Sequence, residues 1–383
     1  MGILVIDVET TIKNKGSSFT KDNKLCLVGL MTWFDQYKIY DIEYSQNPYG
    51  NKLNEIQEQI EQSSILVGFN IKFDLHWLRR YGVNFHHRKI WDCQIAHFLI
   101  TQQQSRFPSL DGVAAFYELG MKEDVVKGMW DEGIDTPNIP WAILESYLKQ
   151  DLNLTYKIYL KQKEYFNLHP DLYRLFYLEM VDLLVLEEME WNGMRFDKEQ
   201  SFALAIDTTN KLNSIYSSFS FNCPINFTSG DHISALLYGG IVKEKYRESY
   251  QVTLKSGEVK QKERWSIKEH ILPRQVAPLP KTEMAKKGYY ATDKVTLQQL
   301  THKKISKETK RLLEGIIEYG DLSHLNGTYY EGLPAQMDLH GDEEYIHGQF
   351  NQVVAVTGRL SSSKPNLQNR DKRIDHCFIS RYD

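Results

Sequence analysis

Two acidic residues interrupt the first apolar run of the chain. The run from Ile3 to Val8 has the composition of a buried β-strand, and Asp7 and Glu9 stand two positions apart at its end. Because side chains at i and i+2 of a strand point to the same face, these two carboxylates must lie side by side. Neighbouring carboxylates repel each other unless a proton or a cation lies between them. The pattern therefore favours either an exposed edge strand or a site for a hard divalent cation such as Mg²⁺ or Mn²⁺.

The N-terminal part of the chain alternates β-rich runs with helical patterns, which predicts an α/β fold. Strands are expected at residues 3–8, 25–34, 38–44 and 64–70, and helices at residues 54–62, 74–80 and 141–165. The short turn Asp35-Gln36-Tyr37 joins the second and third strands, so the sheet should be mixed and open with antiparallel neighbours. Pro170 ends this alternation, and the pattern of apolar residues beyond it is mainly helical.

Three further residues of the N-terminal part point toward the same acidic site. Asp74 follows the apolar strand, at a strand-to-helix junction where α/β sheets usually build their sites. Asp151 lies on the expected buried face of the long helix, where a carboxylate needs a partner. Tyr147 precedes it by four residues, so its hydroxyl can project beside that carboxylate. Taken singly, Asp74 could be a helix cap and Tyr147 could pack in the core.

Charge is segregated along the chain. The formal net charge is −4, yet residues 243–310 carry 17 Lys and Arg against 8 Asp and Glu. Such a segment can neutralise the phosphates of a nucleic acid, or it can be a solvated lysine-rich loop. Within it, Lys255 to Glu258 has the composition of a hairpin turn.

Length and composition exclude several classes of protein. The 383 residues predict two or three domains. No apolar run approaches the about 18 to 20 residues that span a bilayer, so no membrane association is expected. The four cysteines are isolated and lack metal-site spacing, which predicts buried thiols and a cytoplasmic protein.

The acidic motifs resemble those of the DEDD 3′-5′ exonucleases, in the tyrosine subclass. They occur in order as DVETT at 7–11, NIKFD at 70–74 and YLKQD at 147–151. The resemblance implies an RNase H-like fold and two divalent ions, Mg²⁺ or Mn²⁺, held by Asp7, Glu9, Asp74 and Asp151. It further implies that Tyr147 orients the attacking water and that Asn70 contacts DNA. Four aromatic residues fit either the core or a stacking platform for an unpaired base: Phe107, Phe116, Trp130 and Trp141.

The C-terminal part resembles another family. The string TGRLSSSKPNLQN at 357–369 is similar to the TGRLSS…PNLQN signature of family A DNA polymerases. This resemblance implies an exonuclease domain at 1–168, a thumb-like DNA-binding region at 169–335 and the start of a palm at 336–383. A basic insertion at about 242–287 has no clear counterpart in the family. DNA contacts are implied for Thr357, Arg359, Ser361, Asn366, Gln368 and Asn369.

The chain also departs from that family. Arg370 follows the signature where the family continues with Ile-Pro, and the palm aspartate motif, the fingers lysine helix and the late His-Asp-Glu motif do not occur before Asp383. We therefore expect a proofreading-type exonuclease that acts on DNA 3′ ends in replication, with no nucleotide addition by this chain alone. One alternative is the DNA-gripping component of a split, phage-type polymerase in the host cytoplasm, completed by a second chain. Another is an RNA exonuclease resembling RNase D, against which the TGRLSS string argues.

Overall fold

The computed structural model describes residues 2–32, 36–45, 52–120, 125–253 and 259–382. Contacts between these residues define two compact units, which we describe separately. The sheet unit comprises Met1–Asp197 and Ala335–Asp383, and the hairpin unit comprises Lys198–Pro334. The turn predicted at Lys255 to Glu258 lies outside the described residues, as does Asp35 of the other predicted turn.

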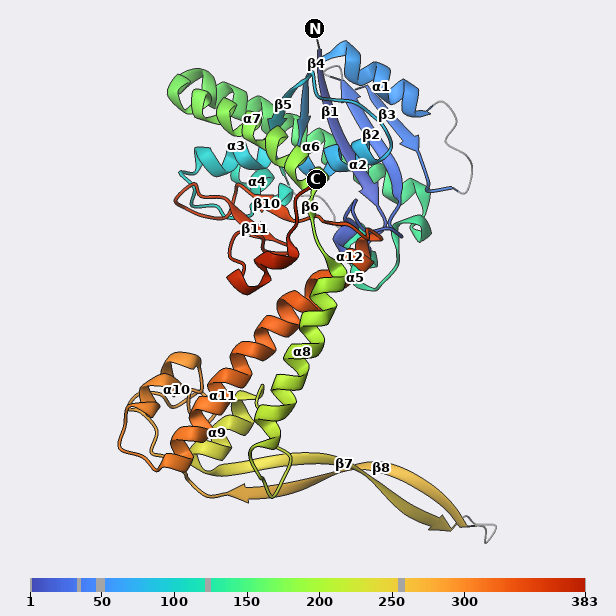
Figure 1. Cartoon of the computed structure of the whole chain (residues 1–383). Coiled ribbons are helices and arrows are strands. Elements are labelled where there is room, and N and C mark those ends of the chain that lie inside the picture. The colour runs from blue at the N-terminus through green and yellow to red at the C-terminus, as the bar shows by residue number, and fades with distance from the viewer. Residues whose placement is uncertain (1, 33–35, 46–51, 121–124, 254–258, 383) are drawn as a thin grey trace. The chain divides into compact units, whose positions relative to one another are not determined.

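A five-stranded mixed sheet forms the centre of the sheet unit (Figure 1). Its strands are β1 (Gly2–Thr10), β2 (Leu25–Thr32), β3 (Tyr37–Asp41), β4 (Ser63–Gly68) and β5 (Lys89–Asp92), in the order β3-β2-β1-β4-β5. Strand β1 pairs antiparallel with β2 and parallel with β4. Strand β3 extends the antiparallel side and β5 the parallel side. The predicted mixed α/β sheet with antiparallel first neighbours is therefore confirmed.

Seven α-helices accompany the sheet among the described residues of this part of the chain. They are α1 (Lys52–Gln62), α2 (Lys72–Arg80), α3 (Cys93–Ile100), α4 (Leu110–Phe116), α5 (Val125–Asp131), α6 (Trp141–Leu168) and α7 (Pro170–Asn192). Helix α6 lies so close to β2 that a Cβ atom on Gly29 would stand 2.8 Å from Cγ of Leu148. Gly29 pairs with Asp7 across the β1–β2 ladder, and paired residues share a face. The face of the sheet that carries Asp7 is therefore the face that α6 covers.

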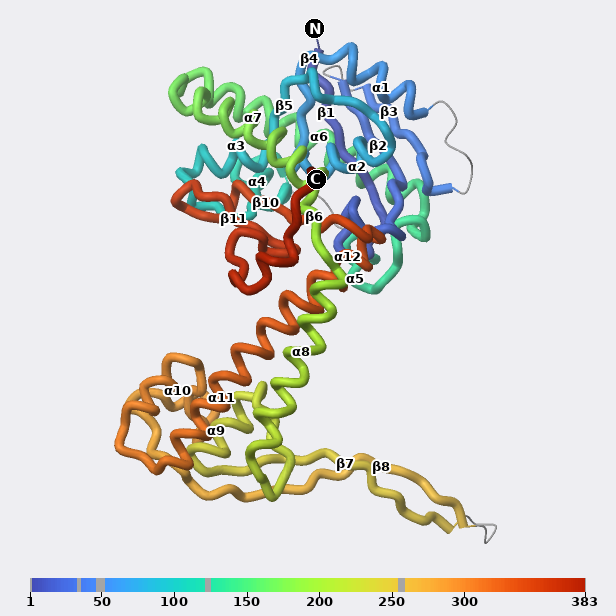
Figure 2. The backbone as a smooth tube through the Cα atoms, viewed as in Figure 1, coloured from blue at the N-terminus to red at the C-terminus, as the bar shows by residue number. Residues whose placement is uncertain are grey.

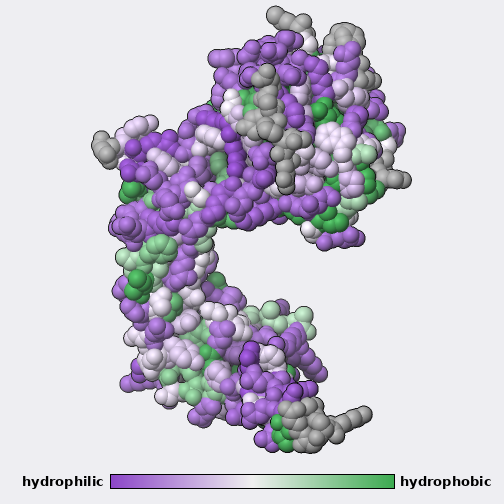
Figure 3. Space-filling view, turned by 90° about the vertical axis from the view of Figure 1, so that its right-hand side faces the viewer, coloured by the Kyte–Doolittle hydropathy of each residue, from purple (hydrophilic) through white to green (hydrophobic). Residues whose placement is uncertain are grey.

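The core of the sheet unit fills the space between the sheet and its helices. Val5, Leu66 and Leu152 are fully buried there, and Trp91 donates through Nε1 to Oε1 of Gln162 at 3.0 Å. All four cysteines are buried and free, as predicted. Outer surfaces are mostly hydrophilic on the face seen in Figure 3. No helix among the described residues is both long enough and apolar enough to cross a bilayer.

Short strands complete the C-terminal part of the sheet unit. Strand β6 (Met194–Arg195) pairs with β9 (Tyr345–Ile346), and β10 (Gln349–Asn351) pairs with β11 (Ser361–Ser363). Helix α12 (Gly332–His340) precedes β9 in the chain. A buried polar network fastens β10 to the helices: Glu190 of α7 accepts from Lys72 at 2.6 Å and from the backbone N–H of Phe350 at 2.5 Å. Nε2 of His76 lies 2.8 Å from the same carboxylate.

The hairpin unit contains helices and one long two-stranded hairpin. Its elements are α8 (Lys198–Ser217), α9 (Gly230–Tyr238), β7 (Gly240–Thr253), β8 (Val259–Leu272), α10 (Lys294–Thr301), α11 (Lys307–Leu325) and the π-helical turn η3 (Asn326–Tyr330). The helices share a second core that includes Leu237, Leu300 and Leu313. Figure 2 shows the hairpin extending away from these helices. The mainly helical character was predicted, whereas the two 14-residue strands β7 and β8 were not.

Candidate active site

Three carboxylates meet on the face of the sheet that α6 covers. One oxygen of each of Asp7, Glu9 and Asp151 lies within 4.8 Å of the other two. Asp7 and Glu9 belong to β1, where the two-residue spacing aligns them, and Asp151 belongs to α6. Glu9 is 5% exposed and Asp151 is 7% exposed, so water screens their charges poorly. We call these three residues the acid cluster.

Asp74 lies beside the acid cluster, in the first turn of α2. Its Oδ1 accepts a hydrogen bond of 3.0 Å from the backbone N–H of Val8, the residue between Asp7 and Glu9. Burial, and next the negative charge of Asp7, raise the pKa of Asp74 well above its usual range. Asp74 thus holds α2 against β1 and stands next to the cluster, although its oxygens are not among those within 4.8 Å of one another.

A chain of side-chain contacts links Tyr147 to the end of β1. It precedes Asp151 by one helical turn, and its ring meets Trp130 edge to face at a centroid distance of 5.7 Å. Nε1 of Trp130 donates to Oγ1 of Thr136 at 3.1 Å, and Thr136 donates to the carbonyl of Thr10 at 2.6 Å. The structure therefore places Tyr147 and Asp151 on one helix that is tied to the strand carrying the other acids.

Asp92 is a buried acid that the motifs did not single out. Its carboxylate accepts from the backbone N–H groups of Gln94 and Ile95, which caps α3, and from those of Asn70 and Ile71. Burial raises its pKa to about 6, and these four donors oppose the shift. Asn70 adopts the left-handed backbone conformation, with φ of 57°. Asp92 therefore fixes the loop that leads into α2. Its signal in the sequence was an acid at the end of a strand, directly before a helix.

A cavity of about 270 Å³ lies next to this loop, within the sheet unit. Asn70 and Phe73, both in the motif that ends at Asp74, contribute to its lining. Phe107 also lines it and is 57% exposed, as is Phe116, so neither residue belongs to the core. Lys364 lines it too, and burial together with nearby Lys15 lowers the pKa of that lysine. The cavity thus combines an amide, exposed aromatic surface and positive charge.

The donor chemistry of the acid cluster fits hard divalent cations. Carboxylate oxygens are the ligands that Mg²⁺ and Mn²⁺ prefer, and a cation would relieve the repulsion among three close negative charges. A second set of potential ligands, His86, Glu187 and Glu188, differs in an important respect. Arg79 already pairs with it, with Nη1 at 3.0 Å from Glu187 and 2.7 Å from Glu188. That positive charge disfavours a metal ion there.

The structure spreads the residues expected to contact DNA over three places. Asn70 lies at the cavity, whereas Thr357 and Arg359 lie on an exposed loop between β10 and β11, and Ser361 begins β11. Asn366 accepts through Oδ1 from the backbone N–H groups of Gln368 at 3.1 Å and Asn369 at 3.0 Å. The last three residues therefore form a local turn, in which Asn366 is already engaged.

Two family models match the chain. Residues 4–164 match the model described as 3′-5′ exonuclease, and residues 248–381 match the model described as DNA polymerase family A. DNA polymerase I of Synechocystis sp. (strain ATCC 27184 / PCC 6803 / Kazusa) is 24% identical over 312 residues, which cover 80% of this chain and 27% of that protein. The DNA polymerase of Bacillus phage SP01 is 20% identical over 364 residues, covering 88% of this chain and 37% of the relative. The chain thus spans about a quarter to two fifths of the length of these relatives.

A solved structure shares the fold. It is described as the POL domain of Pol1 from M. smegmatis in complex with DNA primer-template and dNTP, with a TM-score of 0.65 at 18% sequence identity. The match covers 98% of this chain and 54% of the other. Fold, acid cluster and relatives together define a nucleic-acid-processing enzyme. The chain thus combines a segment similar to the 3′-5′ exonuclease domain with a segment similar to DNA polymerase family A.

Proposed function

We propose that this chain removes nucleotides from DNA 3′ ends during replication, as the proofreading part of a family A polymerase. The observation that carries the proposal is the acid cluster, in which Asp7, Glu9 and Asp151 converge within 4.8 Å. Three carboxylates held this close, two of them buried, are costly for a protein unless they bind cations. The match of residues 4–164 to the 3′-5′ exonuclease model supports the same reading.

In this proposal the acid cluster holds two divalent ions, Mg²⁺ or Mn²⁺, with Asp74 completing the ligand set. Bound divalent ions supply a nucleophile at neutral pH and stabilise the attacking and leaving oxygens at phosphorus. The chain supplies position: Tyr147 orients the attacking water, and Asn70 holds the strand end. Phe107 is 57% exposed and, like Asn70, lines the cavity, so it offers a ring on which a terminal base can stack.

A direct test uses a single DNA strand that carries a label on its 3′-terminal nucleotide. Wild-type protein with Mg²⁺ should release labelled mononucleotide, while Asp7→Ala and Asp151→Ala should lower the rate by at least a thousandfold. Asp131→Ala, which removes an exposed carboxylate at the end of α5, is the matched control and should retain full activity. An intact strand with wild-type protein under both Mg²⁺ and Mn²⁺ would contradict the proposal.

The choice between DNA and RNA is tested with matched strands of the same base sequence. We expect faster digestion of DNA, because the curated relatives are DNA polymerases. Faster digestion of RNA would instead support the alternative that resembles RNase D.

A second proposal concerns primer–template binding, which the exposed Arg359 and the basic residues of the hairpin unit support. This proposal includes an exonuclease domain that ends at residue 168, a thumb-like region that ends at residue 335 and the start of a palm beyond it. It also includes a second chain that would supply nucleotide addition. Arg359→Ala should weaken binding to a fluorescent primer–template. Unchanged affinity would remove Arg359 from the proposed contact.

Co-purification of a partner with this chain from the native source would test the second chain.

A further inference from the structure

The sheet unit has a second cavity, of about 650 Å³, whose lining includes no residue of the acid cluster. The segment 18–21, the last turns of α2 and α7, the turn between α12 and β9, and Arg381 contribute to its wall. All of these parts belong to the same compact unit. The volume lies in the range of pockets that hold small organic ligands. We call it the basic cavity, after the three cations Lys21, Arg80 and Arg381 in its wall.

The three cations of the basic cavity have no carboxylate partner among the described residues. The guanidinium of Arg80, which is half-buried, donates to three backbone carbonyls of the segment 18–21 at 2.7 to 3.1 Å. The guanidinium of Arg381 donates to two backbone carbonyls at the end of α7, and Lys21 is exposed. A guanidinium has five N–H donors, so both arginines keep donors for a further acceptor.

The negative charge in the wall is already engaged elsewhere. Among the described residues that line the basic cavity, Asp342 alone carries a carboxylate. This carboxylate accepts from the backbone N–H groups of Glu344 and Tyr345, both at 2.8 Å, and it lies 3.2 Å from Nε2 of His347. One carboxylate cannot balance three cations, so the wall keeps a surplus of positive charge. A partly buried cation without a counter-ion is costly, and a bound anion would remove that cost.

Contacts within the chain hold the three cations in place before any ligand binds. The guanidinium of Arg80 lies over the ring of Trp77 at 5.1 Å, and that of Arg381 lies over the ring of Tyr345 at 4.9 Å. The stem of Lys21 packs on Gly341, where a Cβ atom would stand 2.9 Å from Cδ of the lysine. A site whose side chains are ordered beforehand loses less entropy when it binds a ligand.

We propose that the basic cavity binds a phosphate group, either free or carried by a small molecule of nucleotide size. Guanidinium and ammonium groups together are the side chains that proteins use for phosphate, because they donate charge-assisted hydrogen bonds to its oxygens. The rings of Trp77 and Tyr345 already carry a guanidinium over one face, so the wall offers charge more than open aromatic surface. The inference does not depend on the proposed function, since the two sites share no residue.

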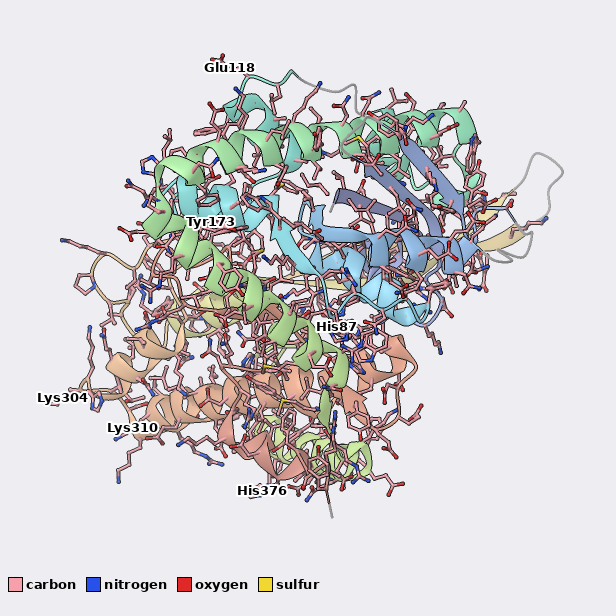
Figure 4. All side chains as sticks on the ribbon, turned by 90° about the horizontal axis from the view of Figure 1, so that it is seen from above. His87, Glu118, Tyr173, Lys304, Lys310 and His376 are labelled. Atoms are coloured by element: carbon pink, nitrogen blue, oxygen red, sulfur yellow. The ribbon has the colours of Figure 1, made fainter. Side chains whose placement is uncertain are left out.

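The test compares two double variants of the whole chain with equal loss of charge. Lys21→Gln and Arg381→Gln together remove two cations of the cavity, while Arg80 stays because it holds the segment 18–21. The matched control combines Arg174→Gln with Lys304→Gln, which are exposed residues outside the cavity. Figure 4 shows Lys304 at the periphery, with its side chain directed outward. Circular dichroism checks that each variant is folded.

Isothermal titration calorimetry in EDTA gives the readout, because phosphate then cannot bind through divalent ions at the acid cluster. The probes are inorganic phosphate, deoxyadenosine 5′-monophosphate and deoxyadenosine, which lacks the phosphate. Wild-type protein should bind at least one of the two phosphates with a stoichiometry of one, and the stronger of the two identifies the source of the group. Deoxyadenosine should not bind. The cavity variant should weaken phosphate binding by about tenfold or more, and the control should keep the wild-type affinity.

Several outcomes would overturn the inference. Failure of both phosphates to bind would do so, as would binding of deoxyadenosine with the affinity of its monophosphate. An equal loss of affinity in the control would show that binding follows total charge. A cavity variant that loses as much affinity for a DNA strand as for the monophosphate would show that the cations contact a polynucleotide instead. Loss of phosphate binding in Asp7→Ala would place the ligand at the acid cluster, so the two sites are distinguishable.

Discussion

Asp151→Asn should stabilise the sheet unit in the absence of divalent ions while abolishing nuclease activity. The acid cluster places this carboxylate within 4.8 Å of those of Asp7 and Glu9, and it is buried. Asparagine preserves the shape of the side chain and removes its charge. A group kept for binding cations should cost stability when those cations are withheld, because its negative charge then lies close to two other carboxylates.

The size of the effect follows from the spacing of the carboxylates. Two unit charges at 4.8 Å repel each other by about 3.5 kcal/mol at an effective dielectric constant of about 20. Proton uptake and the partial exposure of Asp7 relieve part of this repulsion. We therefore expect Asp151→Asn to raise the free energy of unfolding by about 1 to 3 kcal/mol, or the melting temperature by about 2 to 12 °C.

The assay is thermal unfolding in EDTA, followed by tryptophan fluorescence because Trp77 and Trp91 are buried in the sheet unit. Asp131→Asn removes an exposed carboxylate that is not part of the cluster and should leave the melting temperature within about 2 °C of wild type. Added Mg²⁺ at a hundred times its dissociation constant should stabilise wild type by about 2.7 kcal/mol and the variant far less. An Asp151→Asn protein that is less stable than wild type in EDTA, or that keeps its nuclease activity, would refute the reasoning.

Two further predictions concern buried acids outside the cluster. Glu190→Gln leaves the charge of Lys72 without its buried partner and should lower the free energy of unfolding by about 3 to 5 kcal/mol in urea titration; a loss below about 1 kcal/mol would contradict this. Burial raises the pKa of Asp92 to about 6, so the folded protein holds a proton there that the unfolded chain releases. The contribution of Asp92 to the free energy of unfolding is then fully present below about pH 4 and is lost as the pH rises through 6. The free energy of unfolding of Asp92→Asn should therefore rise by up to about 3 kcal/mol relative to wild type between pH 4 and pH 7. A difference between the two proteins that is constant with pH would contradict this prediction.

The parts of the fold that the sequence predicts are those with a local period. The strand β1 and its acids follow from two-residue alternation, and the long helix α6 follows from apolar residues such as Leu144 and Leu148 at helical spacing. The same periods assign Asp7 to one face of a strand and Asp151 to one face of a helix. That the two faces meet depends on tertiary packing, which the ordered family motifs indicated.

Long-range partners and exposed strands were beyond that reasoning. The carboxylate of Glu190 meets Lys72 across 118 positions of sequence, and Asp92 holds a loop that begins 22 positions earlier. No local pattern encodes such pairs. The hairpin strands were missed for a different reason: most of their residues on both faces are exposed, so apolar and polar residues do not alternate as they do over a core.

We propose above that Asp7, Glu9 and Asp151 form a metal-dependent 3′-5′ exonuclease site. The direction of digestion tests this central claim most directly. A single DNA strand labelled at its 5′ end is incubated with wild-type protein and Mg²⁺, with EDTA as the control. We predict a ladder of labelled products that shortens one nucleotide at a time from the 3′ end, which EDTA and Asp7→Ala both abolish. Immediate release of labelled mononucleotide, or a ladder that persists in Asp7→Ala, would contradict the claim.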